Sequence, residues 1–419
     1  MKVLILTYYW PPSGGSGVQR WLKFVKYLQE FDIEPIVYCP DNPNYEVVDD
    51  SLVHEIPKNI TILKHSIYEP NTFFNKKKVA TARVSSNPSM IQRAMQYIRG
   101  NYFIPDARKY WIKPSVRYLT EYLKNNKVDV IISTGPPHSL HLIAMQLKQN
   151  TGVKWIADFR DPMANMFYND TLLLTNKSKE KLQQLETSIL QSADKVITVS
   201  TNLQRDFQRY CKDVFVIPNG FDDELTTIEN LQIDTKFTIS HIGLLPSQSN
   251  PIILWKVLNK LIQENKQFKQ DFQLKLIGNV SDKVVESISE FGLNNHVKFV
   301  EYVPHSKAIK FQKQSQVLLL LIPQVDGAKG IVTGKIFEYL TSKRPILALA
   351  PKDGDVASIL KNTNTGVAIN FDDAIQLKST ILDFYKKYQE DTLKVHGIGI
   401  QQYHRKNLTE KLAQIIKEL

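Results

Sequence analysis

A glycine-rich loop near the start of this 419-residue chain could bind an anion. The loop, Ser13-Gly14-Gly15-Ser16-Gly17, lies between an apolar strand pattern and a helical pattern over residues 18–30. Glycines let backbone N–H groups approach a ligand closely, and a helix N-terminus adds roughly half a positive charge. The loop matches neither the dinucleotide fingerprint Gly-x-Gly-x-x-Gly nor a P-loop ending in Lys-Ser/Thr. It is therefore either an anion site built from Gly15, Ser16 and Gly17 or a turn required only by strand-to-helix geometry.

Two further loops carry side chains suited to proton transfer or charge stabilisation. His138 ends the run Thr134-Gly135-Pro136-Pro137-His138, which follows a strand pattern and opens a helix, so it could donate to a substrate oxygen. A capping or solvent-facing histidine is the alternative. In the run Asp158-Phe159-Arg160-Asp161, Asp158 could hold or deprotonate a sugar hydroxyl while Arg160 positions a carboxylate or phosphate. The same charges could instead form an internal ion-pair network that braces the loop.

The most specific motif lies in the second half of the chain. Asp326-Gly327-Ala328-Lys329-Gly330-Ile331-Val332-Thr333-Gly334-Lys335-Ile336-Phe337-Glu338 follows a buried strand pattern at 317–322. Thr333 or Gly334 would cap a helix whose free N–H groups, reinforced by Lys335, could bind a diphosphate. Glu338 lies one turn into that helix, where its carboxylate could accept both hydroxyls of a ribose. A surface helix with a Lys–Glu pair is the alternative.

Alternating strands and helices must position these loops. Several strand candidates are apolar throughout, as is typical of parallel strands buried on both faces. The expected strands are 2–7, 35–38, 60–63, 128–133, 153–157, 196–199, 214–217, 237–242, 274–277, 297–300, 317–322, 346–350 and 367–369. The expected helices are 18–30, 139–149, 179–191, 252–264, 282–291, 306–314, 334–341, 356–361, 374–388 and 408–418. The pattern predicts two doubly wound parallel sheets joined near Pro218-Asn219-Gly220, with ligands bound between them at strand carboxyl ends.

Composition restricts the class of protein. With 42% hydrophobic and 23% charged residues, the chain is globular rather than disordered or collagenous, and its length favours two or three domains. Two cysteines, Cys39 and Cys211, exclude a disulfide framework and favour a reducing cytoplasm. The apolar runs are too short for a transmembrane helix, and the first is read as a strand rather than a signal peptide.

The net charge of +11 is concentrated in one segment. Residues 71–120 carry one acid, Asp106, and ten basic residues: Lys76, Lys77, Lys78, Arg83, Arg93, Arg99, Arg108, Lys109, Lys113 and Arg117. No convincing strand pattern occurs there, so we expect an insertion of one or two basic helices with exposed aromatic residues. Apolar residues such as Met90, Ile91 and Met95 interleave with the basic ones, which favours an anionic membrane surface. A solvated helical face is the alternative, and the lack of a nucleic-acid module argues against nucleic acid.

Taken together, these motifs resemble glycosyltransferases of the α/β GT-B fold, and more narrowly the retaining family 4. The resemblance rests on the first loop, Pro-Asn-Gly-Phe-Asp at 218–222 and Gly-Lys-Ile-Phe-Glu-Tyr-Leu at 334–340. Tyr-Tyr-Trp-Pro-Pro-Ser-Gly-Gly and Ala-Asp-Phe-Arg-Asp-Pro are similar to bacterial members that build surface polysaccharides, including lipopolysaccharide. The resemblance implies two Rossmann-like domains facing a cleft: an acceptor domain at 1–218 with an insertion at about 71–120, and a donor domain at 219–395. A last helix within 396–419 would cross back onto the first domain.

The resemblance also implies roles for individual residues. Glu338 matches the second Glu of the family's Glu-x7-Glu motif, whereas the position of the first Glu is Gly330, so the 329–332 backbone or Asp326 would cover the donor sugar. The family's basic pair near Gly243 is missing, which leaves the diphosphate charge to Lys335 and Lys329. The donor-binding residues would be Gly15, Ser16, Gly17, Gly243, Lys329, Gly330, Thr333, Gly334, Lys335 and Glu338. The catalytic residues would be His138, Asp158 and Lys335, and the acceptor would contact Arg160 and Asp161.

The implied reaction is transfer of a sugar, with retention and without a metal or other cofactor, from a UDP- or GDP-linked donor to a glycan or lipid-linked acceptor. Departure of the nucleoside diphosphate leaves an oxocarbenium-like sugar, so stabilising the leaving charge is the main task. A nucleotide-sugar epimerase or hydrolase and a non-catalytic GT-B-like scaffold subunit are the alternatives. We expect a cytoplasmic protein that attaches peripherally to the inner face of the plasma membrane.

Overall fold

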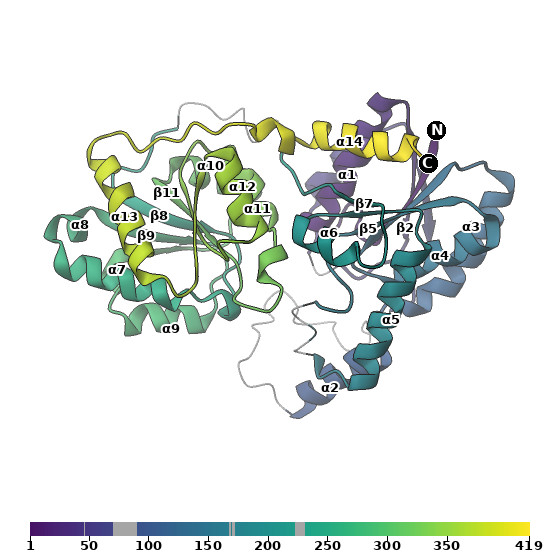
Figure 1. The fold of residues 1–419 in the computed structure, drawn as a ribbon, viewed down its shortest axis with the longest axis horizontal. Coiled ribbons are helices and arrows are strands. Elements are labelled where there is room, and N and C mark those ends of the chain that lie inside the picture. Colours follow the sequence, from purple (N-terminus) through teal and green to yellow (C-terminus); the bar gives the residue numbers. More distant parts are fainter. Residues whose placement is uncertain (46, 70–89, 167–168, 170–171, 223–230) are drawn as a thin grey trace. The chain divides into compact units, whose positions relative to one another are not determined.

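The computed structural model describes residues 1–45, 47–69, 90–166, 169, 172–222 and 231–419 (Figure 1). The chain forms two compact units. Unit 1 comprises Met1–Asn219 and Arg405–Leu419, and unit 2 comprises Gly220–His404. The sequence placed the return to the first domain at residue 396, whereas in the structure the chain rejoins unit 1 at Arg405.

Unit 1 is built on a seven-stranded sheet with the order β3-β2-β1-β4-β5-β6-β7, in which every pairing is parallel. Its strands are β1 (Lys2–Leu6), β2 (Glu34–Pro40), β3 (Thr61–His65), β4 (Val130–Gly135), β5 (Lys154–Phe159), β6 (Lys195–Thr198) and β7 (Val214–Val216). Leu4 pairs with Ile36 on one side and with Ile131 on the other, so β1 is central and apolar at every inner position. All seven expected strands are confirmed, and the order reverses between β1 and β4, where open sheets bind ligands.

Helices cover both faces of this sheet. They are α1 (Ser16–Leu28), α2 (Met90–Tyr102), α3 (Ile112–Asn125), α4 (Ser139–Thr151), α5 (Asn176–Ser192), α6 (Thr201–Phe207) and α14 (Arg405–Lys417). The apolar stripe of α1, with Val18 and Trp21, packs in one core with Leu408 and Leu412 of α14. Helices α3, α4 and α5 contribute to the core on the opposite face. The last helix of the chain therefore belongs to unit 1, where Arg405 donates to Gln19 of α1.

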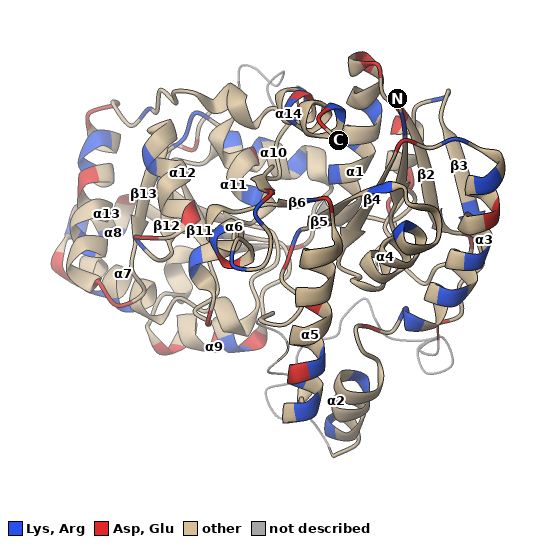
Figure 2. Ribbon diagram, turned by 45° about the vertical axis from the view of Figure 1, so that its right-hand side comes forward, with Lys and Arg blue, Asp and Glu red and all other residues tan. Residues whose placement is uncertain are grey.

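Part of the basic segment at residues 71–120 packs into the core of unit 1 and is not a separate external insertion. Trp111 is 1% exposed and its ring stacks on Tyr38 of β2, with ring centroids 5.1 Å apart. Lys113 and Arg117 of α3 are exposed, and Figure 2 shows several basic residues along this helix. The described part of the segment thus includes two helices as expected, but its second half is part of the core. The predictions for Lys76, Lys77, Lys78 and Arg83 lie outside the described residues.

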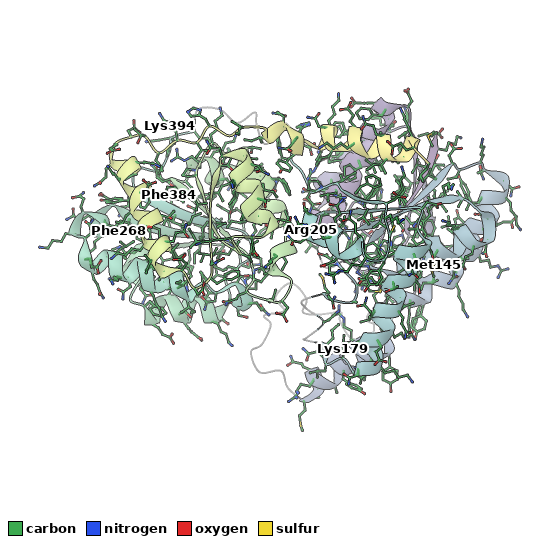
Figure 3. All side chains as sticks on the ribbon, in the orientation of Figure 1. Met145, Lys179, Arg205, Phe268, Phe384 and Lys394 are labelled. Atoms are coloured by element: carbon green, nitrogen blue, oxygen red, sulfur yellow. The ribbon has the colours of Figure 1, made fainter. Side chains whose placement is uncertain are left out.

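Unit 2 is built on a six-stranded parallel sheet with the order β10-β9-β8-β11-β12-β13. Its strands are β8 (Phe237–Ile242), β9 (Phe272–Ile277), β10 (Val297–Val300), β11 (Val317–Leu321), β12 (Ile346–Leu349) and β13 (Gly366–Ile369). Its helices are α7 (Ile252–Glu264), α8 (Lys266–Asp271), α9 (Asp282–Glu290), α10 (His305–Gln314), α11 (Gly334–Leu340), α12 (Asp355–Thr363) and α13 (Ala374–Gln389). Phe268 of α8 and Phe384 of α13, labelled in Figure 3, belong to the core formed with α7 and α9. A second core contains α10, α11 and α12.

The two sheets confirm the expected α/β class and the thirteen expected strands. The short helices α6 and α8 were not expected, because seven or six residues are too few for a clear apolar period. Within the parts that the structure describes, no helix has both the length and the apolarity needed to cross a bilayer. Cys39 and Cys211 are free.

Candidate active site

Three of the predicted loops meet at the carboxyl ends of β1, β4 and β5. Arg160, which follows β5, donates its backbone N–H to the carbonyl of Gly135 at 3.0 Å. A Cβ on Gly17 would stand 2.6 Å from Nη1 of Arg160, so the missing side chain at position 17 lets the guanidinium lie against this loop. Because neighbouring parallel strands end at the same edge, the sheet order brings together loops separated by more than a hundred residues.

Arg160 is held in this cluster rather than exposed on the surface. Its guanidinium lies 5.8 Å from the ring centre of Tyr9 and donates to the carbonyl of Pro136. Its Nε is buried and has no hydrogen-bond partner among the described residues. Burial raises the pKa of the adjacent Asp161 carboxyl, and the charge of Arg160 opposes that rise. Arg160 and Asp161 are therefore partly shielded from water, and the Nε of Arg160 could donate a hydrogen bond to a polar ligand.

His138 is buried, with 5% of its surface exposed. It occupies the N-cap position of α4, and its imidazole lies within hydrogen-bonding reach of the backbone of Pro162. Burial lowers its pKa to about 4; Arg160 adds to this effect, while Asp106 and the hydrogen bond with the Pro162 backbone oppose it. The imidazole is thus neutral near pH 7 and has one N–H donor and one acceptor.

Asp106, the one acid of the basic segment, caps helix α4 beside His138. Its carboxylate accepts from the backbone N–H of Ser139 at 2.9 Å and from the Ser139 hydroxyl at 2.8 Å. Asp106 also accepts from the backbone of Arg108 at 2.8 Å. Sequence reasoning missed this role, although a lone acid in a basic run was a signal. The basic segment therefore helps to build the loop that carries His138.

Asp158 is fully buried, and both of its carboxylate oxygens are engaged. Oδ1 accepts from Arg20 at 2.8 Å, and Oδ2 accepts from Trp21 and Thr134 at 2.8 Å each. Arg20 also donates to the carbonyl of Pro218 at 3.1 Å, where unit 1 ends. This geometry corresponds to the bracing alternative, since it leaves Asp158 no exposed oxygen for a sugar hydroxyl. The network ties β4, β5 and α1 to the end of the first half of the chain.

In unit 2, Lys335 reaches across to the end of β8. Its Nζ lies 3.3 Å from Nε2 of His241 and 3.3 Å from the carbonyl of Leu244. A Cβ on Gly243, where φ is +114°, would stand 2.7 Å from Cε of Lys335. Gly243 and Lys335, both predicted donor residues, are therefore in contact, and Lys335 occupies the surroundings in which the family's basic pair was expected. His241 was missed, because a buried histidine in a strand gives no local signal.

Burial changes the protonation of this cluster. It lowers the pKa of Lys335 to about 8, although Glu338 opposes the change. Burial also lowers the pKa of His241 to about 3, and the charge of Lys335 adds to this effect. His241 is therefore neutral, and its Nε2 can accept from Lys335 while Nδ1 donates to the carbonyl of Leu319 at 3.2 Å. The ammonium of Lys335 is thus partly desolvated and held in one place.

Glu338 contacts two polar residues of α10. Its Oε1 lies 3.1 Å from Nε2 of His305, and its Oε2 accepts from Gln312 at 2.8 Å. The Glu338 side chain is 23% exposed. A ribose held by Glu338 would therefore share the carboxylate with α10 or replace one of these contacts. Sequence reasoning missed both α10 residues, which lie 33 and 26 positions away.

The remaining predicted donor residues differ in their surroundings. Thr333 stands at the N-cap of α11, but its side chain makes no capping bond, and its Oγ1 has no hydrogen-bond partner among the described residues. Thr333, one of the two residues predicted to cap this helix, is therefore its N-cap residue, although its hydroxyl makes no capping bond. Lys329 pairs on the surface with Asp353 at 2.5 Å, and Gly330 ends the short 3-10 turn Ala328–Gly330. Gly15 has φ of +90° with open space around it, and Gly334 is the first residue of α11.

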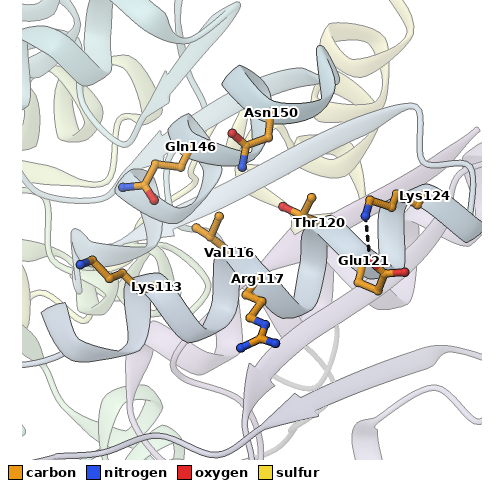
Figure 4. A pocket seen from close by; sticks show the side chains of 8 residues that line it. All are labelled: Lys113, Val116, Arg117, Thr120, Glu121, Lys124, Gln146 and Asn150. Carbon is orange, nitrogen blue, oxygen red and sulfur yellow. Dashed lines mark hydrogen bonds and ion pairs between the residues drawn. The ribbon is translucent and has the colours of Figure 1, made fainter.

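Three cavities lined by described residues are small or open. One of about 120 Å³ lies at the carboxyl ends of β11 and β12 and includes Asn250, Gln324 and Phe371. A groove of about 350 Å³ runs between α3 and α4 (Figure 4), and its lining includes Lys113 and Arg117 of α3 and Gln146 and Asn150 of α4. A second groove of about 830 Å³ lies on the other side of α3. In the described ranges, no group of three or more His, Cys, Asp or Glu side chains could hold a metal ion.

Comparison with known proteins identifies the family. Residues 15–225 match Glycosyltransferase Family 4, and residues 223–414 match Glycosyl transferases group 1. No curated protein sequence matches the chain.

Solved structures show the same fold at low identity. Anabaena HepE in complex with UDP-glucose has a TM-score of 0.61 at 13% identity, with 100% of each chain covered. The lipopolysaccharide outer core galactosyltransferase WaaB has a TM-score of 0.60 at 14% identity, also with 100% of each chain covered. A putative UDP-N-acetylglucosamine 2-epimerase from Listeria monocytogenes has a TM-score of 0.56 at 11% identity, covering 100% of this chain and 96% of that one. With both halves matched and two Rossmann-like units present, the chain belongs to the family 4 glycosyltransferases of the GT-B fold.

Proposed function

We propose that this glycosyltransferase moves a sugar from a UDP- or GDP-linked donor to a glycan or lipid-linked acceptor, with retention and without a metal. The contact of Lys335 with Gly243 and His241 is the observation that carries the proposal. A departing nucleoside diphosphate gains negative charge, and a fixed, partly desolvated ammonium stabilises that charge more than a solvated one would. The complex of HepE with UDP-glucose and the lipopolysaccharide role named for WaaB support this donor class and a role in surface polysaccharide synthesis.

The other residues take roles that follow from their positions. Glu338 accepts the donor ribose hydroxyls, and the backbone of the Lys329–Gly330 turn contacts the donor sugar. Neutral His138 binds a sugar hydroxyl, while Arg160 and Asp161 bind the acceptor. Asp158, whose oxygens are all engaged, is assigned a positioning role instead of a catalytic one.

Nucleotide-sugar binding tests the proposal. We expect calorimetry to detect binding of a UDP-, GDP- or ADP-sugar, and Glu338→Ala to weaken it by on the order of 100-fold, because charge-assisted hydrogen bonds to the ribose are lost. Glu286→Ala, which removes an exposed carboxylate from α9, should leave binding unchanged. A folded protein that binds none of these donors would contradict the enzyme proposal and favour the scaffold alternative.

An epimerase or hydrolase is the second candidate, since its fold is shared and Gly330 replaces the family's first Glu. Such an enzyme would convert or hydrolyse the donor with no acceptor present. A transferase should show much faster donor consumption when a lipid-linked or glycan acceptor is added.

We further propose that helix α2 attaches unit 1 to an anionic membrane. Ile91, Met95, Ile98 and Tyr102 are spaced on one side of the helix and are all exposed. The helix contains Arg93 and Arg99 and no acidic residue. Exposed apolar residues with flanking cations suit the headgroup region of a bilayer.

The start of α5 adds positive charge beside α2. Thr175, the N-cap of α5, donates its backbone N–H to Asn101 of α2 at 2.8 Å. The first turns of α5 expose Lys177, Lys179 and Lys181 around a single acid, Glu180, and Lys179 is labelled in Figure 3. Each cation near an anionic surface contributes about 1 kcal/mol to attachment.

Vesicle sedimentation tests this attachment. We expect the wild-type chain to bind phosphatidylglycerol vesicles, and Arg93→Glu with Arg99→Glu to weaken binding by about tenfold or more. Lys256→Glu with Lys283→Glu, which changes the charge equally on unit 2, is the control. Binding that depends neither on α2 nor on anionic lipid would refute the proposal.

A further inference from the structure

Two residues of α10, His305 and Gln312, contact the carboxylate of Glu338 and differ in burial. Nε2 of Gln312 donates to Oε2 of Glu338 at 2.8 Å, and Nε2 of His305 lies 3.1 Å from Oε1. Gln312 is 3% exposed, whereas the side chain of His305 is 50% exposed and that of Glu338 is 23% exposed. One carboxylate oxygen is therefore bonded to a buried amide and the other to an imidazole at the surface.

The sequence of α10 explains why both side chains reach Glu338. His305, Ile309 and Gln312 are spaced by four and three positions, so they lie on one side of the helix. Ile309 is buried in the same core as Phe337, the neighbour of Glu338 in α11. That core holds the two helices together and directs the side of α10 that carries His305 and Gln312 towards Glu338.

Both helices are also fixed to strand β8. Oγ of Ser315, the C-cap residue of α10, lies 2.7 Å from Oγ of Ser240 in β8. In α11, the hydroxyl of Tyr339 accepts from the backbone N–H of Ile242 at 3.2 Å. The sheet therefore sets the separation of the two helices, and with it the contact between their side chains.

The two bonds to Glu338 differ in what it costs to break them. A buried amide that loses its charged acceptor is left unsatisfied, so the bond from Gln312 to Oε2 persists when a ligand binds. An exposed imidazole exchanges a carboxylate for water at little cost, so the bond from His305 to Oε1 is the one that can be given up. A ligand hydroxyl that approaches Glu338 would thus displace His305 and leave Gln312 in place.

We propose that Gln312 is a positioning residue for Glu338 and that His305 competes with the donor ribose for the same carboxylate. The buried amide holds the carboxylate in one orientation, in which Oε1 accepts a ribose hydroxyl once His305 has moved into solvent. Because the free site is partly occupied by its own histidine, the affinity for a nucleotide is lowered. The inference rests on the proposed contact between Glu338 and the donor ribose, and it predicts effects of opposite sign for the two α10 residues.

Calorimetry at a single pH tests the opposite signs. The probes are UDP and GDP, each compared with its 2′,3′-dideoxy counterpart, which keeps the diphosphate but has no ribose hydroxyl for Glu338. We expect the wild-type chain to bind one of the two ribonucleotides about tenfold or more tightly than its counterpart. His305→Ala should strengthen binding of that ribonucleotide by about two- to tenfold, whereas Gln312→Met should remove most of the preference for ribose. Neither variant should change the affinity for the dideoxy nucleotide.

Control variants separate these contacts from a general loss of structure. Gln314→Met makes the same substitution two positions further along α10, where a side chain does not share the face of Gln312, and it should bind both nucleotides as the wild-type chain does. His305→Gln keeps an N–H donor and should return the ribonucleotide affinity towards the wild-type value. Equal losses for the ribonucleotide and the dideoxy nucleotide in Gln312→Met, or weaker ribonucleotide binding in His305→Ala, would overturn the proposal.

The outcomes also separate the roles of the α10 residues from the proposed function. A folded wild-type protein that binds neither ribonucleotide would refute donor binding, and with it both proposals. A wild-type protein that prefers the ribonucleotide, while His305→Ala and Gln312→Met have no effect or effects of the same sign, would support the proposed function and refute the roles of His305 and Gln312.

Discussion

Lys335→Met is expected to lower kcat by on the order of 10²–10³-fold, the usual cost of removing one donor that stabilises a developing negative charge. The Lys335 ammonium is the cation held against Gly243 and His241, and Lys329 is instead paired with Asp353. Methionine keeps the length and the apolar stem of lysine, so the packing around Gly243 is retained. Steady-state kinetics would measure the change, and circular dichroism would check folding. Lys329→Met should have a much smaller effect, and equal losses in the two variants would contradict the assignment.

The pKa of Lys335 adds a pH dependence to the same prediction. Its folded-state pKa of about 8 lies below the ordinary value of 10.5, so in the free protein the ammonium loses its proton as pH rises through about 8. A bound diphosphate favours the charged form, and affinity for a nucleotide sugar should therefore be constant below about pH 7 and fall above pH 8. A nucleotide sugar is the better ligand for this test than a nucleoside diphosphate, whose terminal phosphate titrates near pH 6.

Lys335→Arg is the matched control for the pH profile. Arginine stays charged throughout this range, so its binding curve should be flat between pH 7 and 10. The pKa of His241, about 3, lies far below the range and contributes no step. A wild-type affinity that is also flat to pH 10 would show that the Lys335 charge does not contribute to donor binding.

Asp158→Asn is expected to destabilise unit 1 by about 3–5 kcal/mol. The substitution leaves the buried guanidinium of Arg20 without its counter-charge, in a site where the side chains of Arg20 and Asp158 are 2% and 0% exposed. The charge-assisted bonds from Trp21 and Thr134 are also weakened. Urea unfolding followed by the fluorescence of Trp21 and its neighbours in unit 1 would measure the loss, treating the two units as separate transitions.

Two control variants test whether the loss of stability in Asp158→Asn comes from the buried ion pair with Arg20. Glu121→Gln removes an exposed partner of Lys124 from the same unit and should have little effect, because surface ion pairs contribute little. Arg20→Met combined with Asp158→Asn removes both charges, and should recover part of the loss through the coupling between the two sites. If Asp158→Asn leaves stability unchanged but abolishes transfer, Asp158 acts on substrate and the bracing role is wrong.

Several features of the site could be predicted because they depend on residues near one another in sequence. The glycine loop, the His138 loop and the Asp158 loop were placed after strands because parallel strands are apolar throughout, and strand ends are readable from that pattern. Their convergence followed from the rule that ligands bind at strand carboxyl ends. The Gly334–Leu340 motif placed Lys335 and Glu338 on one helix face for the same local reason.

The partners of those residues could not be predicted, because they come from distant parts of the chain. Lys335 and His241 are 94 positions apart, and Arg20 and Asp158 are 138 apart. Asp106 caps α4 from within a segment whose charge suggested a purely external role. Neither periodicity nor composition records such contacts.

By itself, the sequence determined the class and order of the elements, since alternating apolar runs and helical stripes can be buried only as two doubly wound sheets. It also determined which loops stand at strand ends and which family the motifs resemble. Only the tertiary structure decided which of the site's side chains are charged and which already have hydrogen-bond partners within the protein. Desolvation and hydrogen bonding depend on every neighbour of a group. Burial leaves His138 neutral and lowers the pKa of Lys335, while Arg20, Trp21 and Thr134 occupy both carboxylate oxygens of Asp158.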